Sequence, residues 1–186
     1  MKKYLHIALM LFCVLAVSSC KDDDDDKKAV EQEAYKLEQE AAFQAKINEG
    51  YEKWASEDND GFVFAKLIKK GDGKQAYFNS RVSVYYKGSL TNGDVFDQKL
   101  LEDGTPFLCA VSPYYTTPTY ETPSYGSVIT GWGVALQHMV EGDKYEVWIP
   151  QQLAYGANGS GSIPGYSTLI FEIELVSVDV QAVKPS

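Results

Sequence analysis

The sequence predicts an α+β protein in which a curved antiparallel β-sheet wraps around one short helix, with a further helix before it. Three observations support this prediction. From Phe62 onward apolar and polar residues alternate, as in strands with one buried face. A short helical stripe near Trp132 interrupts the alternation. Residues 29 to about 56 have a composition that favours helix.

The first nineteen residues are typical of a secretion signal. Two lysines precede an apolar run from Tyr4 to Val17, which is shorter than the roughly 20 apolar residues that span a membrane. Val17-Ser-Ser-Cys20 resembles the bacterial lipobox, which implies that residues 1–19 are removed and Cys20 carries a lipid. An ordinary secretory signal with an incidental cysteine is the alternative.

Residues 20–28 form an acidic tether with five consecutive aspartates, a run that cannot pack into a core. It is interpreted as a solvated spacer or as a sorting signal, because similar acidic clusters follow the lipidated cysteine of some surface lipoproteins. We therefore expect a lipid-anchored protein of the bacterial envelope, in the outer membrane and on either its periplasmic or its cell-surface face.

Charge and cysteine content exclude several classes of protein. The net charge of −9 argues against a nucleic-acid partner, because the negatively charged phosphates of a nucleic acid bind basic protein surfaces. Once the signal is removed and Cys20 is acylated, Cys109 is the remaining cysteine, so no disulfide can form within one mature chain. We expect Cys109 to be a packed free thiol rather than a nucleophile.

Residues 29–60 are predicted to be a helix followed by a linker, which Gly61 ends. One thin apolar stripe runs along the helix at three- and four-residue spacing, and the rest of its surface is polar. The helix is thus either a stalk or a docking element, and dimerisation through it is a further alternative. The stripe consists of Val30, Ala34, Leu37, Ala41 and Ala45.

Residues 61–180 form the main domain, in which period-two alternation marks the strands. Asn92-Gly93 predicts a hairpin turn between the segments that contain Tyr86 and Phe96. The apolar, inward-facing positions are Val82, Val84 and Tyr86, then Tyr145, Val147 and Ile149, then Leu169, Phe171, Ile173 and Leu175.

One short helix is expected across the concave face of the sheet, with Thr130 as its cap and Gly142 as its end. Its inward stripe is Trp132, Ala135, Leu136 and Met139. The segments between this helix and the sheet contain more aromatic residues than the packing of a helix on a sheet requires. The excess indicates that aromatic side chains line a cavity here as well as filling the core.

Three ordered blocks resemble the FKBP-type peptidyl-prolyl cis-trans isomerase family over roughly residues 62–179. The first is Val82-Ser-Val-Tyr-Tyr-Lys-Gly-Ser-Leu90 with Gly93-Asp-Val-Phe-Asp97. The second runs from Val128-Ile-Thr-Gly-Trp132 to Gly142, and the third contains Leu153-Ala-Tyr-Gly156 and Ile163-Pro to Phe171.

This resemblance implies isomerisation of Xaa–Pro bonds in proline-containing polypeptide clients, with neither cofactor nor metal. It places Asp97 beside the twisting amide, the Tyr155 hydroxyl on a substrate carbonyl and the Ile129 backbone N–H on another carbonyl. It implies a pocket floor at Trp132 and a rim at Ile163. The implied walls are Tyr86, Phe96, Phe107, Val128, Ile129 and Phe171.

Two departures from the family support a rival hypothesis, a non-catalytic module that binds a proline peptide or a partner. Ser112 to Gly126 is an insertion rich in Tyr and Pro, which would extend the pocket or block it. Glu102-Asp103 stand where a basic residue often pairs with the pocket Asp97. His138 lies where the family has no catalytic base and is expected at the surface.

Overall fold

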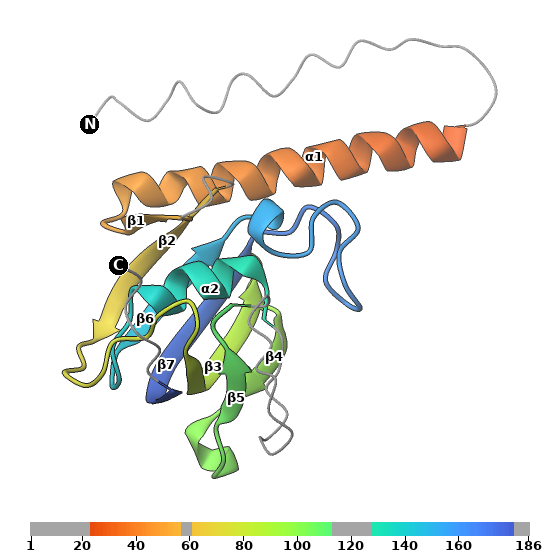
Figure 1. Cartoon of the computed structure of the whole chain (residues 1–186). Coiled ribbons are helices and arrows are strands. Elements are labelled where there is room, and N and C mark those ends of the chain that lie inside the picture. The colour runs from red at the N-terminus through yellow and green to blue at the C-terminus, as the bar shows by residue number, and fades with distance from the viewer. Residues whose placement is uncertain (1–22, 57–60, 113–127, 181–186) are drawn as a thin grey trace. The chain divides into compact units, whose positions relative to one another are not determined.

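The structure, a computed structural model, describes residues 23–56, 61–112 and 128–180. Within these residues, seven strands form one antiparallel sheet in the spatial order β1-β2-β6-β7-β3-β4, with β5 also paired to β3. Helix α2 (Thr130–Gln137) lies across one face of this sheet (Figure 1). The predicted fold class, an antiparallel sheet with one short helix and a preceding N-terminal helix, is confirmed.

Most strands are short, and two long ones lie side by side near the middle of the sheet. Short 3₁₀ turns follow α1, β4 and β6, at Lys46–Asn48, Leu101–Asp103 and Gln151–Leu153. The strands are β1 (Glu52–Ala55), β2 (Phe62–Lys69), β3 (Arg81–Leu90), β4 (Val95–Lys99), β5 (Phe107–Ala110), β6 (Lys144–Ile149) and β7 (Leu169–Val180).

The pairing of β3 with β7 extends from Arg81 opposite Val180 to Leu90 opposite Leu169. Because β4 and β5 also pair with β3, this strand sets the register of one half of the sheet. The predicted hairpin after β3 is confirmed. The N–H of Gly93 donates to the carbonyl of Leu90, and Gly93 has a φ of +91°, which glycine adopts without steric cost.

Helix α2 buries the predicted stripe, but both of its ends differ from the prediction. Its N-cap position is Ile129, and Thr130 is the first helical residue, so the prediction that Thr130 caps the helix is wrong. The helix ends at Gln137, and Gly142 instead forms the turn before β6 with a φ of +88°. The buried stripe is Trp132, Ala135, Leu136 and Met139.

The main core lies between α2 and the sheet. A Cβ on Gly131 would collide with the side chain of Ile149, so the helix can approach β6 this closely only with glycine at that position. The fully buried members of this core are Val63, Ala65, Ala76, Val82, Val84, Cys109, Val111, Ala135, Leu136, Met139, Val147, Ile149, Leu169, Ile173 and Leu175.

The N-terminal helix α1 extends from Asp23 to Ala45, so it begins inside the acidic run and ends before the expected limit near residue 56. The chain instead forms β1, which places Trp54 opposite Val63 and against the core. A four-residue strand with one inward apolar side chain has too little alternation for a period-two signal, which is why this strand was missed.

From Ala34 onward α1 is a docking element. Phe43 is 3% exposed and packs against Phe62 and Phe64, with ring centroids 5.3 and 4.9 Å apart. Phe64 alternates along β2 with the core residues Val63 and Ala65, so this second cluster lies on the face of the sheet opposite α2. The stalk alternative is wrong for this part of the helix.

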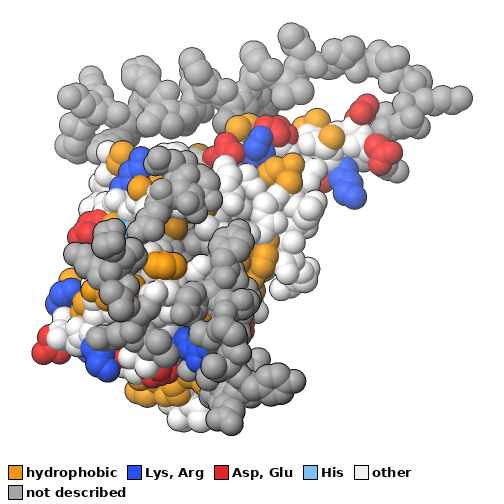
Figure 2. Space-filling view, viewed as in Figure 1, with side chains coloured by type: hydrophobic (Ala, Val, Ile, Leu, Met, Phe, Trp, Pro, Cys, Tyr) orange, Lys and Arg blue, Asp and Glu red, His pale blue; other side chains and the backbone are white. Residues whose placement is uncertain are grey.

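The apolar stripe predicted on α1 faces outward. Val30 is 64% and Leu37 is 57% exposed, and Figure 2 shows apolar side chains at the surface along this helix. The buried side is formed instead by Tyr35, Gln39 and Phe43, which are spaced by four residues. Dimerisation through the helix stays a prediction. None of the helices in the described ranges has the length and apolar character needed to cross a membrane.

Truncating Phe43 tests the docking of the helix. We expect Phe43→Ala to lower the free energy of unfolding by about 3 kcal/mol, because the substitution leaves a cavity between helix and sheet. Guanidinium unfolding followed by circular dichroism measures this loss. Leu37→Ala, on the outward side of the same helix, is the matched control and is expected to change stability by less than about 0.5 kcal/mol. Equal losses from the two substitutions would contradict the docked arrangement.

Candidate functional site

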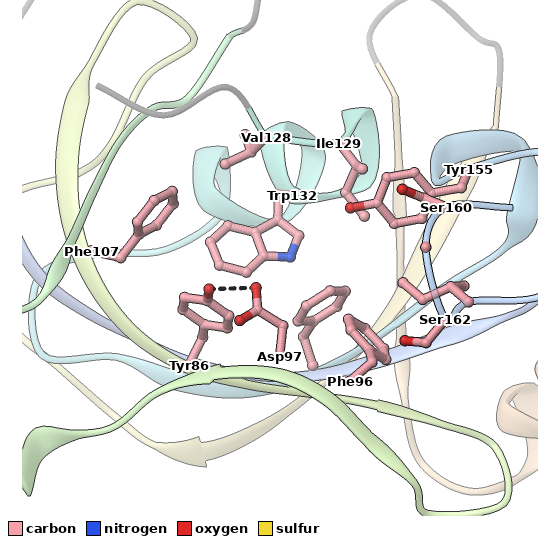
Figure 3. A pocket seen from close by; sticks show the side chains of 13 residues that line it. Tyr86, Phe96, Asp97, Phe107, Val128, Ile129, Trp132, Tyr155, Ser160 and Ser162 are labelled. Atoms are coloured by element: carbon pink, nitrogen blue, oxygen red, sulfur yellow. Dashed lines mark hydrogen bonds between the residues drawn. The ribbon is translucent and has the colours of Figure 1, made fainter. Parts of the chain in front are cut away.

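A pocket of about 520 Å³ opens between α2, the sheet and the loop that precedes β7. All ten side chains predicted for the site line this pocket (Figure 3), although they come from seven separate elements and loops. They are Tyr86, Phe96, Asp97, Phe107, Val128, Ile129, Trp132, Tyr155, Ile163 and Phe171. The structure therefore brings the predicted residues together, while their individual roles stay predictions.

Trp132 lies at the bottom of the pocket, in the first turn of α2. Its indole is 4% exposed and meets the rings of Tyr86 and Phe171 nearly edge-on, with centroids 5.0 and 5.2 Å apart. Such edge-to-face pairs are favourable and fix the ring orientation. The floor is thus a rigid apolar surface.

The wall formed by Phe96 and Phe171 depends on a glycine in β3. The two rings are 5.5 Å apart between centroids, and a Cβ placed on Gly88 would come within 2.7 Å of both. Any larger residue at position 88 would push these rings into the pocket. Phe107 from β5 closes the opposite side of the pocket, with its ring centroid 5.7 Å from that of Tyr86 (Figure 3).

A single polar pair lies among these aromatic rings. The Tyr86 hydroxyl donates to Oδ2 of Asp97 at 2.7 Å. Removal from water, together with this bond to the carboxylate, raises the pKa of Tyr86 above its ordinary value, so the hydroxyl keeps its proton. Tyr86 therefore holds the Asp97 carboxylate, although Glu102-Asp103 replace the basic residue that often pairs with this aspartate in the family. Asp103 instead accepts the backbone N–H of Leu100 at 2.6 Å.

The loop between Ala154 and Thr168 forms one rim of the pocket. Figure 3 shows Tyr155 beside Ser160, on the side away from Phe107, and Tyr155 is 40% exposed. Within the loop, Ser160 and Ile163 exchange two backbone hydrogen bonds, of 3.0 and 2.9 Å. This tight turn also brings Ser160, Gly161 and Ser162 to the pocket, three residues that sequence reasoning missed. The only available signal was the Gly-Ser-Gly-Ser composition before Ile163, which is typical of a turn.

Two other residues singled out from the sequence lie apart from the pocket. His138 is exposed, as expected; its ring is stacked on Trp54 at 4.7 Å, and its Nδ1 lies 2.9 Å from the carbonyl of Val134. The insertion from Ser112 to Gly126 falls almost entirely outside the described residues. Across the described ranges, no group of three His, Cys, Asp or Glu side chains is arranged to hold a metal ion.

Cys109 is fully buried in β5, two residues along from Phe107. Burial raises the pKa of its thiol to about 12. Since the thiolate is the reactive form, the side chain is inert in the folded protein. This agrees with the predicted packed free thiol.

Alkylation tests the state of Cys109. In mildly alkaline buffer, we expect iodoacetamide to leave Cys109 unmodified in the folded chain and to modify it in guanidinium, because thiolate forms only when the thiol is exposed to water. Mass spectrometry of the peptide that contains Cys109 measures the modified fraction. Equal rates of alkylation in the folded and the unfolded chain would contradict a buried thiol.

Comparison with known sequences agrees with this geometry. The family profile described as FKBP-type peptidyl-prolyl cis-trans isomerase matches residues 73–176. The chain is 41% identical over 114 residues to the FKBP-type 22 kDa peptidyl-prolyl cis-trans isomerase of Escherichia coli, a match that covers 61% of this chain and 48% of that protein. It is 37% identical over 119 residues to the FK506-binding protein of Neisseria meningitidis, covering 63% and 97%.

Solved structures give the same fold. The crystal structure of a peptidyl-prolyl cis-trans isomerase from Pseudomonas syringae pv. tomato is similar with a TM-score of 0.57 and 28% sequence identity, covering 86% of this chain and 98% of that one. The chain spans about half the length of several of the curated relatives that it matches.

Proposed function

The chain belongs to the FKBP-type peptidyl-prolyl cis-trans isomerase family, and we propose that it catalyses cis-trans isomerisation of Xaa–Pro bonds in polypeptide clients. One observation carries the proposal: an aromatic pocket with Trp132 as its floor contains a single hydrogen-bonded polar pair, Tyr86 and Asp97. An apolar pocket of this size suits the ring of a proline residue and excludes water from it.

The pocket chemistry accounts for the rate enhancement that the activity requires. Rotation about the amide C–N bond has a barrier of about 18–20 kcal/mol, because the planar amide is stabilised by resonance. Resonance places negative charge on the carbonyl oxygen, and the twisted amide has lost this charge separation. A site that excludes water therefore favours the twisted amide over the planar one. Neither a nucleophile nor a metal takes part in this mechanism.

The polar groups around the pocket would orient the substrate. Asp97 is held by Tyr86 next to the bound ring, where its carboxylate orients the dipoles of the twisting amide. The Tyr155 hydroxyl, on the loop rim, would donate to a substrate carbonyl. The backbone N–H of Ile129, at the start of α2, would donate to a second carbonyl and so fix the direction of the peptide.

We further propose that the protein works in the bacterial envelope, held to the outer membrane by a lipid on Cys20. The sequence pattern supports this: an apolar run, small residues and then cysteine precede an acidic segment. The proposed organisation is a signal at 1–19, an acidic tether that continues into α1 at Asp23, and an isomerase domain at 61–180 to whose sheet β1 adds an edge strand. Residues 1–22 lie outside the described residues.

The isomerase proposal predicts the effect of two substitutions in the pocket. We expect the full chain, kept in mild detergent, to accelerate isomerisation of a short Xaa-Pro peptide. Asp97→Ala should lower kcat/KM by about tenfold, since it removes the carboxylate near the reacting amide, and Tyr155→Phe should lower it by about fivefold through loss of one hydrogen bond. A protease-coupled assay measures both.

Glu38→Gln, a surface change on α1, serves as the control and should leave kcat/KM unaltered. If the folded wild-type chain gives no acceleration, the enzyme proposal fails. Quenching of tryptophan fluorescence by the same peptide would then favour the alternative, a non-catalytic module that binds proline peptides.

The lipid anchor is tested separately by Cys20→Ser. In a Gram-negative host we expect the unchanged chain to partition into the detergent phase of a Triton X-114 extract and to label with a radioactive fatty acid. The variant should move to the aqueous phase without label, because serine lacks the thiol that would carry the lipid and no acyl chain then holds the protein to the membrane. Detergent-phase recovery of the variant would contradict lipidation at Cys20.

A further inference from the structure

Gln39 is a polar residue on the buried side of α1, and it is only 2% exposed. Its side-chain Nε2 donates to the hydroxyl of Thr91 at 2.9 Å, and its Oε1 accepts the backbone N–H of Thr168 at 3.1 Å. The hydroxyl of Thr168 in turn donates to the backbone carbonyl of Gln39 at 3.1 Å. The amide of one side chain is therefore bonded to two segments that are far apart in the sequence.

These two segments lead to two different sides of the pocket, called its two rims below. Thr91 directly follows β3 and opens the turn to β4, the strand that carries Phe96 and Asp97. Thr168 ends the loop that carries Tyr155 and Ser160, immediately before β7. Because Leu90 and Leu169 are paired neighbours in the sheet, the residues beyond them lie close together and both face α1.

Further contacts hold the same loop end to the helix. The Tyr35 hydroxyl lies 2.8 Å from Oγ of Ser167, and the Lys36 ammonium lies 5.7 Å from the ring centroid of Tyr166. Tyr166 has a φ of +66°, a left-handed conformation that is unusual for an aromatic residue and is maintained only when neighbouring contacts impose it. Its N–H donates to the carbonyl of Gly156 at 2.8 Å, which closes the base of the rim loop.

We propose that Gln39 is a positioning residue for the isomerase site, through which α1 fixes the distance between the two rims of the pocket. The inference rests on the proposed function. Residues 91–94 of the hairpin turn and the 154–168 loop lie beyond the paired parts of β3, β4 and β7, so strand pairing alone does not set the separation of these two segments. The buried Gln39 amide uses both its N–H group and its oxygen to bind these two segments. Because an unpaired buried polar group costs free energy, the amide favours the one arrangement in which both bonds are made.

Gln39→Leu tests this role, because leucine has a similar size but offers no hydrogen bond. In the full chain, kept in mild detergent, we expect kcat/KM for the Xaa-Pro peptide to fall about tenfold, since small displacements of substrate-positioning groups are costly for catalysis. Amide hydrogen exchange, measured by mass spectrometry, should become faster in 91–94 and 156–168 and stay unchanged in the strands.

Thr91→Val is a milder second variant, which cuts the bond to the hairpin and keeps those to Thr168. It should speed exchange in 91–94 alone and lower kcat/KM by about threefold. Val178→Ala is the control. It truncates a buried residue near the far end of β7, so it lowers thermal stability without touching the rim contacts, and its kcat/KM should equal that of the wild type.

The outcomes separate the two proposals. An inactive wild-type chain would sink the proposed function, while the exchange measurement would still report whether Gln39 holds the two rims. Unchanged exchange in both rims of a folded Gln39→Leu chain would overturn the positioning role. The control gives a second way to overturn the positioning role. If Val178→Ala and Gln39→Leu lower Tm equally and also lower kcat/KM equally, general destabilisation explains the loss of activity.

Discussion

The burial of the Trp132 indole under α2 links the stability of this protein to its site. One side of the ring completes the core beneath the helix, and the other forms the floor of the pocket. Its edge-on contacts with Tyr86 and Phe171 join α2 to the two central strands. Gly131 also permits a close approach to Ile149, so that the helix packs directly against β6. The remaining pocket walls are arranged around this fixed ring.

The register of β3 then decides which side chains reach the pocket. Tyr86 points to the concave side, Gly88 leaves space for two aromatic rings, and pairing with β4 places Asp97 opposite Gly88. A shift of one residue would move Tyr86 to the other face and break its bond to Asp97. The polar pair therefore depends on strand pairing and on the Gly93 turn, and needs no charged neighbour.

Alternation in β3, β6 and β7 and the helical stripe of α2 made the fold predictable from sequence, because one face of each element is strongly apolar. The ten pocket residues were predictable only through the resemblance of three ordered blocks to the FKBP family, since most of them lie outside these patterns. The N-terminal helix was harder. Its apolar stripe at Val30 and Leu37 is exposed, whereas its buried side includes Gln39, which hydropathy places outside a core. A buried amide is acceptable only when its hydrogen-bond partners are present. Those partners, Thr91 and Thr168, are more than fifty residues away in sequence and give no local signal.

Hydrogen bonds from Gln39 constrain the pocket in a way that apolar contacts do not. Apolar contacts such as those of Phe43 are not directional, so they hold α1 against the sheet while allowing small sliding movements. Hydrogen bonds to defined atoms fix both distance and angle. The loop before β7 has little sheet pairing of its own, since the bridge between Ser160 and Ile163 joins only residues within the loop. In the proposed role of Gln39, its bonds to Thr91 and Thr168 supply a constraint on the two loops beyond the strand ends, so that α1 contributes to the shape of the pocket.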